Sequence, residues 1–405
     1  MQDKPKRKLK ICWQSNAPYA PSGYAQQSAD LKRKFLESGW DGSNFALINM
    51  FGSSGGIFKD ADGILNYPIM DHVVGSDAMI WHGKHFKSDI VITLQDIWML
   101  NPQDLQQVPG FIPWLPVDFD PVPKPILGNA RLANRIIAMS KFGQKALQDN
   151  GLSSTYIPHH VDTSIFFPLN KEKRKMEVKI DPKTFIFGMV SANKDLIPRK
   201  SFGHVLLAFK KFHEAHPNSV LYIHTDPDNQ GGYPLRTHVD FLGLNDCVGF
   251  PDKYKLRFDT PKSEMNQIYG TFDCLLSPSS TEGFCIPVIE AQATGTPVIV
   301  NDYTSMPELI QNGKTGFITK VSDDCQHFMP IGGYMRFPSV NSLYEKMEAV
   351  FVANRAEMGV WGRKFIEENF ALDKVWSERW LPFLDRLEAE LYPQKPVVDT
   401  AKKTA

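Results

Sequence analysis

The stretch SPSSTEGFCIPVIEA, residues 277–291, organises the interpretation of the whole chain. An apolar run leads into it, a loop containing Gly283 follows, and Pro287 suits the start of a helix because its missing N–H would have no partner there. We expect this helix to end at Gly295. The free backbone amides of residues 284–286 and the positive helix end would then point into a ligand site, which favours a diphosphate.

Two carboxylates frame this expected anion site. Glu282 lies in the loop, and Glu290 lies in the first turn of the expected helix. A carboxylate can accept two hydroxyl hydrogen bonds, so it suits the vicinal diol of a ribose or a hexose. For Glu290 alone, a favourable interaction with the helix dipole is the simpler role. Together with the amides, the two carboxylates predict a site for a ligand that carries a diphosphate and vicinal hydroxyl groups.

The segment resembles the E-x7-E motif of retaining GT-B glycosyltransferases, in particular glycosyltransferase family 4. Residues 291–299 (AQATGTPVI) are similar to the family's EAmAxGxPVI segment, and residues 307–310 (PELI) and 313–317 (GKTGF) are similar to its pEli and GxtGfl segments. An isolated E-x7-E pair is a weak signal, but the ordered string is specific. The resemblance covers roughly residues 9–385 and is loosest over residues 50–135.

The resemblance implies a function for each residue of the motif. Glu282 would contact the transferred sugar, and Glu290 would contact the ribose. Cys285 stands where the family usually has glycine; we interpret it as a neutral packing thiol rather than a nucleophile. The backbone between the two carboxylates would meet the diphosphate and the sugar: Gly283, Phe284, Cys285 and Ile286.

A second group of residues, SANKDLIPRK at 191–200, follows an apolar run that we interpret as the first strand of a second domain. Fixed cations there would stabilise the negative charge of a departing nucleoside diphosphate. The resembled family has an Arg and, further on, a Lys in this region. Lys194 and Lys200 occupy those places, so we predict both as catalytic diphosphate ligands, with Arg199 as the neighbour that would substitute.

Glycine-containing loops follow the first apolar runs of the chain. Gly23 opens a helical pattern shortly after the first run and permits close backbone approach to a ligand. In the resembled family a glycine-rich loop here lies near the donor phosphate and the acceptor, so Gly23 is a candidate donor contact. Residues 52–56 (GSSGG) fit a flexible loop on the acceptor side.

Two aspartates are candidates for contact with the acceptor hydroxyl. Residues 92–98 (ITLQDIW) resemble the family's TlHDlW, with Gln95 in place of the usual His, so Asp96 remains as an acceptor contact or general base. Asp118 is the second candidate, with a structural turn-forming role as the alternative. The adjacent His159 and His160 would not face one site in an extended segment and are interpreted as structural, so we predict no metal site.

The fold class that follows is α/β, with two Rossmann-like doubly wound domains of the GT-B type facing a central cleft. Short apolar runs separated by helical patterns, including residues 45–50, 78–81 and 90–94, indicate parallel strands in the first domain. We place the domains at residues 1–168 and 169–360. Residues 361–405 would be C-terminal helices that cross back to the first domain.

Composition narrows the remaining possibilities. The lysines and arginines together number 45, and so do the aspartates and glutamates, so the formal net charge is zero. Such a chain has no overall charge that would favour binding to nucleic acid or to an anionic membrane. Five scattered cysteines fit a reducing compartment, and no apolar run approaches the roughly 20 residues needed to span a bilayer. We therefore expect a cytoplasmic protein that has no integral membrane segment and needs no cofactor beyond its nucleotide-sugar cosubstrate.

Donor and acceptor identity stay open. The resemblance implies transfer of a hexosyl group with retention, from UDP-glucose, GDP-mannose or another UDP- or GDP-linked sugar. The acceptor could be a glycan, a lipid, a small molecule, a protein or a modified DNA base, the last as in phage-type enzymes. A catalytically degenerate nucleotide-sugar-binding protein is the main alternative. A phosphorylase that uses pyridoxal phosphate ranks lower, because no lysine is evidently placed for that cofactor.

Overall fold

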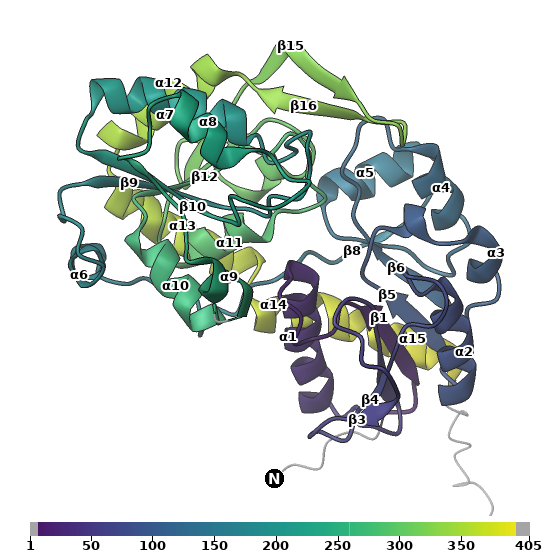
Figure 1. Ribbon diagram of the computed structural model, residues 1–405. Helices are drawn as coiled ribbons and strands as arrows, with labels where there is room; N and C mark the ends of the chain where they lie inside the picture. Colours follow the sequence, from purple (N-terminus) through teal and green to yellow (C-terminus); the bar gives the residue numbers. More distant parts are fainter. Residues whose placement is uncertain (1–6, 259, 394–405) are drawn as a thin grey trace, which may run out of the picture.

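An eight-stranded sheet forms the centre of the first domain in the computed structural model, which describes residues 7–258 and 260–393 (Figure 1). The strands follow the order β3-β4-β2-β1-β5-β6-β7-β8, and all neighbours are parallel except β3 and β4. The strands are β1 (Ile11–Ser15), β2 (Phe45–Asn49), β3 (Phe58–Lys59), β4 (Leu65–Tyr67), β5 (Ile90–Thr93), β6 (Phe111–Leu115), β7 (Ile137–Ala138) and β8 (Thr155–Tyr156).

Helices cover this sheet, so β1, β2, β5 and β6 are buried along their whole length. The helices are α1 (Gly23–Glu37), α2 (Ser76–Phe86), α3 (Pro102–Leu105), α4 (Lys124–Ala130) and α5 (Lys141–Asp149). Residues 78–81, expected as a strand, lie in α2. The expectation was wrong because a four-residue apolar run is compatible with both the alternation of a strand and the spacing of a helix. Here Ala78, His82 and Phe86 are buried at helical spacing.

The second domain contains a six-stranded parallel sheet in the order β11-β10-β9-β12-β13-β14. Its strands are β9 (Phe185–Val190), β10 (Ser219–His224), β11 (Val248–Gly249), β12 (Cys274–Ser277), β13 (Val298–Asn301) and β14 (Gly316–Thr319). Its helices are α7 (Phe202–Ala215), α8 (Leu235–Phe241), α9 (Lys253–Phe258), α10 (Lys262–Thr271), α11 (Ile286–Ala293), α12 (Val340–Val352) and α13 (Arg355–Asn369).

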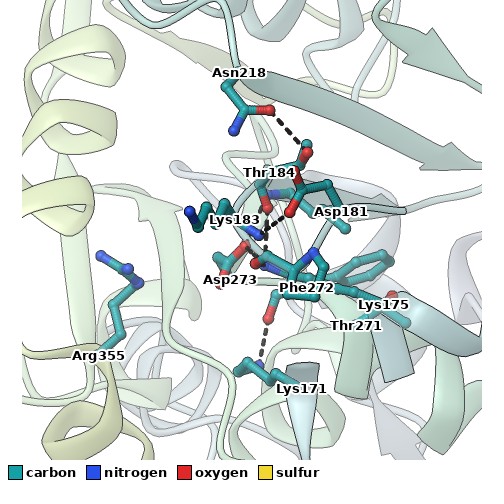
Figure 2. A network of polar contacts seen from close by, with 12 residues as sticks. Lys171, Lys175, Asp181, Lys183, Thr184, Asn218, Thr271, Phe272, Asp273 and Arg355 are labelled. Atoms are coloured by element: carbon teal, nitrogen blue, oxygen red, sulfur yellow. Dashed lines mark hydrogen bonds and ion pairs between the residues drawn. The ribbon is translucent and has the colours of Figure 1, made fainter. Parts of the chain in front are cut away.

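A short helix, α6 (Lys171–Glu177), anchors the linker between the domains to the second one (Figure 2). The buried Lys175 Nζ lies 2.6 Å from Asp273 Oδ2 and donates to the Thr184 carbonyl at 2.9 Å. Lys171 Nζ contacts the Phe272 carbonyl and lies 3.0 Å from Thr296 Oγ1. Since removing one partner of a buried ion pair is costly, α6 is firmly attached to the second domain.

The chain returns to the first domain directly after α13. There the Val161 N–H donates to the Phe370 carbonyl at 2.9 Å, and the Leu372 N–H donates to the Val161 carbonyl at 3.0 Å. The domain boundary expected at residue 361 lies within α13, which packs on α11 of the second domain. The crossing therefore takes place where α13 ends, several residues beyond the expected boundary.

The C-terminal helices α14 (Leu372–Val375) and α15 (Leu381–Leu391) lie against the first domain, with a π-helical turn over Trp376–Trp380 between them (Figure 1). The buried Trp380 packs edge-on against Trp13 and Trp114, with ring centroids 5.7 and 5.0 Å apart. Burying an indole of this size contributes strongly to a core, so this C-terminal segment helps to hold the first domain together. Residues 394–405 of the expected C-terminal segment lie outside the described residues.

A two-stranded antiparallel hairpin, β15 (Val321–Phe328) and β16 (Tyr334–Pro338), reaches from the second domain across to the first (Figure 1). Met335 and Phe337 of β16 pack on the buried Phe119 of the first domain. The Tyr303 hydroxyl donates to the Tyr334 carbonyl at 2.8 Å and accepts from the Asp120 N–H at 3.2 Å. The hairpin therefore fixes the loop that carries Asp118.

The architecture confirms the expected α/β fold of two Rossmann-like domains. Within the part of the chain that the structure describes, no helix is long and apolar enough to cross a membrane. Over the same residues, no group of three or more His, Cys, Asp or Glu side chains is arranged to hold a metal ion.

Candidate active site

Glu282 lies in the loop between β12 and α11 and is ion-paired with two cations from the loop after β9. Its Oε2 lies 2.9 Å from Arg199 Nη1, and its Oε1 contacts Lys200 Nζ. Burial alone would raise the pKa of Glu282, but the charges of Arg199 and Lys200 lower it to about 2. The carboxylate is therefore ionised over the whole physiological range, next to two cations suited to a diphosphate.

Backbone contacts hold Arg199 in place. The Ser280 N–H donates to the Arg199 carbonyl at 2.8 Å, and Arg199 Nη1 also donates to the Thr281 carbonyl at 2.9 Å. Lys194, predicted at the family's Arg position, is exposed instead. Arg199, expected only as its substitute, makes the ion pair with Glu282.

Gly283 and its neighbours pack against the first domain. A Cβ atom at Gly283 would lie 2.7 Å from Pro116 Cβ, so only glycine allows this approach. The Phe284 ring packs on His159, with centroids 5.2 Å apart. Cys285 has a φ of +94°, a left-handed conformation that glycine adopts more easily. Burial raises the pKa of its thiol to about 11, so it is a neutral group beside Ser277.

The amino ends of two helices meet at this point. Gly23 is the first residue of α1, and a Cβ there would lie 3.2 Å from Cδ1 of Ile286, the first residue of α11. Neither helix has an acidic residue in its first turn. Both positive helix ends are therefore available to an anion bound near Arg199 and Lys200.

Asp96 and Asp118 enter the site from the first domain, after β5 and β6. Both are half-buried. Burial, with a further contribution from the Asp96 carboxylate, raises the pKa of Asp118 to about 7. Burial also raises the pKa of Asp96, and the charge of Arg199 opposes this shift. The two acids and Arg199 thus belong to one electrostatic environment between the domains.

Tyr24 is a site residue that the sequence interpretation missed. Burial raises the pKa of its hydroxyl well above the usual value, and the charges of Asp96 and Asp118 add to this shift. It directly follows Gly23, so its place in the first turn of a helix beside a candidate glycine was the available signal.

Gln95 points away from these acids into the first domain. Its side-chain amide donates to Gln14 Oε1 at 2.9 Å, and the N–H of its neighbour Leu94 donates to the Gln14 carbonyl. His159 is also buried, and its Nδ1 lies 2.9 Å from Gln27 Oε1. Burial holds the pKa of His159 well below its usual value, which fits a structural side chain.

Glu290 lies on α11 and is buried, as Glu282 is. The helix begins at Ile286, so Glu290 falls in the second turn rather than the expected first turn. The Tyr269 hydroxyl donates to Glu290 Oε2 at 2.7 Å, and burial raises the pKa of Glu290 to about 6. An ion pair between the domains lies nearby, with Lys262 Nζ 2.6 Å from Asp30 Oδ2.

Comparison with known proteins identifies the second domain. Residues 170–328 match the family model of glycosyl transferases group 1. This part of the chain is a glycosyltransferase group 1 domain. The motif residues Glu282 and Glu290 and the cations Arg199 and Lys200 all lie within it.

Among curated proteins, an uncharacterized glycosyltransferase of Sulfolobus islandicus rod-shaped virus 1 is 31% identical over 176 residues, which is 41% of this chain and 47% of the relative. A D-inositol 3-phosphate glycosyltransferase of Actinosynnema mirum is 26% identical over 168 residues, 40% of this chain and 38% of that protein. The chain thus matches less than half the length of each of these relatives.

Two solved structures match nearly the whole fold. Sucrose-phosphate synthase from Thermosynechococcus elongatus has a TM-score of 0.75 at 14% identity and covers 94% of this chain and 100% of its own. Anabaena HepE in complex with UDP and glucose has a TM-score of 0.67 at 15% identity and covers 93% and 100%. The fold of this chain is GT-B.

Proposed function

We propose that this protein is a retaining glycosyltransferase that moves a hexosyl group from a nucleotide sugar to a hydroxyl acceptor. One observation carries the proposal: Glu282, Arg199 and Lys200 meet where the amino ends of α1 and α11 approach each other. An anionic diphosphate fits this concentration of positive charge and helix ends.

The donor would lie mainly on the second domain. Arg199 and Lys200 would neutralise the departing diphosphate, and the backbone of residues 283–286 would bind it. Glu282 would accept hydroxyl hydrogen bonds from the transferred sugar, and Glu290 would accept those of the ribose. Because HepE was solved with UDP and with UDP-glucose, UDP-glucose is the first donor to test and GDP-linked sugars are the second.

The acceptor would approach from the first domain. Asp118 and Asp96 would orient its hydroxyl towards the anomeric carbon, with Tyr24 beside them. The new bond would form on the face from which the diphosphate departs, as the resemblance to retaining enzymes implies. Within this scheme the protein contributes positioning and charge stabilisation.

A nucleotide panel followed by product analysis tests the proposal. Thermal unfolding would be measured with UDP, GDP, ADP and their common sugar conjugates, because a ligand that binds only the folded state raises the midpoint. NMR of the product would then report its anomeric configuration. Stabilisation by one nucleotide and a product with the donor's configuration support the proposal; an inverted product removes the retaining mechanism, and no response to any nucleotide overturns the donor site.

A nucleotide-sugar-binding protein without turnover is the second candidate. Gln95 stands where the resembled family has His and is directed into the first domain. Donor binding with no transfer to any acceptor, and no hydrolysis, would favour this candidate.

A further inference from the structure

Exposed apolar side chains gather on the loops that leave the first sheet beside Asp96. Parallel strands β1, β2, β4 and β5 end at one edge of the sheet, so the loops after them emerge together. Apart from Ile57, which directly precedes β3, six large apolar side chains on these loops are 41–78% exposed. They form what we call the apolar rim: Tyr19, Phe51, Met70, Val73, Trp98 and Met99.

Hydrogen bonds join the first three of these loops into one surface. The Ala17 N–H donates to the Phe51 carbonyl at 2.9 Å, and the Tyr19 hydroxyl donates to the Gly52 carbonyl at 2.8 Å. The Ile69 N–H then donates to Ser53 Oγ at 3.0 Å.

The fourth loop connects this surface to the candidate active site. The side-chain amides of Gln14 and Gln95 donate to the Val74 carbonyl at 3.0 and 3.4 Å. Asp96 directly follows Gln95 in the chain. The loop that carries Trp98 and Met99 therefore begins at Asp96, and the residue before Asp96 is hydrogen-bonded to the loop that carries Met70 and Val73.

The charges of these loops restrict what binds there. Residues 16–22, 50–57, 68–75 and 96–101 contain no lysine or arginine; their acidic residues are Asp71 and Asp96, and their histidine is His72. A polyanion or an anionic membrane surface would need cations that these loops lack. Exposed apolar patches mark binding surfaces, and the Tyr19 ring is held in place by its hydroxyl.

We infer that the apolar rim binds an uncharged acceptor in which an alkyl or aryl group adjoins the reacting hydroxyl. This inference rests on the proposed glycosyltransferase function and names the class of its acceptor. The apolar group would lie over Phe51 and Trp98, and the hydroxyl would reach Asp96 and Asp118.

Saturation-transfer NMR with octyl and methyl β-glucoside, below the micelle concentration, tests the inference without requiring turnover. We expect saturation of the octyl protons in the wild-type protein and a loss of roughly fivefold or more in Phe51→Ser and in Trp98→Ser, because each variant removes a large aromatic contact. Phe241→Ser is the matched control, because Phe241 is 84% exposed on α8 of the second domain. Octyl saturation that is absent, or that persists in both rim variants, overturns the inference.

Nucleotide binding in the same samples separates the two proposals. Nucleotide binding without octyl binding would overturn the apolar acceptor alone, whereas failure of nucleotide binding would remove the proposed function. Saturation transfer to an oligodeoxynucleotide that is lost in the two rim variants would also overturn the inference, in favour of a nucleic-acid acceptor.

Discussion

The two halves of the candidate site differ in how their charges are paired. On the second domain, Glu282 has two cationic partners and a pKa of about 2. On the first domain, Asp96 and Asp118 form no salt bridge with any described residue, and their pKa values are raised. Glu282 on the donor half thus stays ionised beside its two cations, whereas Asp118 on the acceptor half has a pKa near neutrality.

Removing the Glu282 carboxylate should have the largest effect. Glu282→Gln keeps the shape but leaves Arg199 and Lys200 without their counter-charge and weakens contact with the sugar. We expect kcat/KM to fall about 100- to 1000-fold, the scale of a lost transition-state contact. Glu264→Gln, on α10, is the control; equal activity of the two variants in steady-state assays would contradict the role of Glu282.

Comparing Arg199→Ala with Lys194→Ala separates two cations of one loop. Arg199 contacts Glu282, whereas Lys194 is exposed. We expect a roughly 10- to 100-fold loss of kcat/KM for Arg199→Ala, in the range of lost charge-assisted contacts, and less than about threefold for Lys194→Ala. A larger loss of kcat/KM in Lys194→Ala than in Arg199→Ala would instead support Lys194 as the diphosphate ligand that the motif predicts.

Asp118→Asn tests the pH response of the acceptor half. An ionised Asp118 can accept the acceptor's hydroxyl hydrogen bond, so wild-type kcat/KM should rise with pH through about 7. The variant should lose this rise of kcat/KM with pH. Its kcat/KM at about pH 8 should be about tenfold lower than that of the wild type, somewhat below a typical general-base effect. Asp120→Asn changes an exposed neighbour and should keep the rise of kcat/KM with pH. If the rise survives in Asp118→Asn, the pH dependence belongs to another group.

Glu290→Gln should have the smallest effect. Because burial raises the pKa of Glu290 to about 6, donor affinity should increase as pH rises through this value and the carboxylate ionises. The variant should remove this dependence at a cost of about threefold in Kd at about pH 7.5, as expected for one hydrogen bond. Tyr269→Phe removes a bond to the ionised carboxylate and should move the midpoint to higher pH; titration by calorimetry measures both. If donor affinity still depends on pH with the same midpoint in Glu290→Gln, the pH dependence belongs to another group.

The second domain was largely predictable from the sequence because its motif residues are close together along the chain. The run 185–190 is β9 as expected, and the loop from Glu282 leads into α11, which ends before Gly295 with its φ of +73°. Which of Lys194 and Arg199 would pair with Glu282 was not predictable, because side-chain direction in a loop depends on its backbone path.

The first domain and the contacts between domains were less predictable. The raised pKa of Asp118 depends on burial and on charges from distant segments, and the hairpin over its loop follows from packing of Phe119 on Met335 and Phe337. A strand such as 321–328, with mixed polar residues and no clear alternation, carries little signal of its own. Tyr24 likewise joins the site only in the folded chain, because Asp96 and Asp118 are distant from it in the sequence.

Calorimetric titration of the wild-type protein and Lys200→Ala with UDP, GDP and ADP tests the central claim most directly. Lys253→Ala, an exposed lysine of α9, is the matched control. The account predicts that one nucleotide binds the wild type and the control, and that Lys200→Ala weakens it by about tenfold or more, about 1.4 kcal/mol. Equal affinity of Lys200→Ala, or no binding of any nucleotide to the wild type, would contradict it.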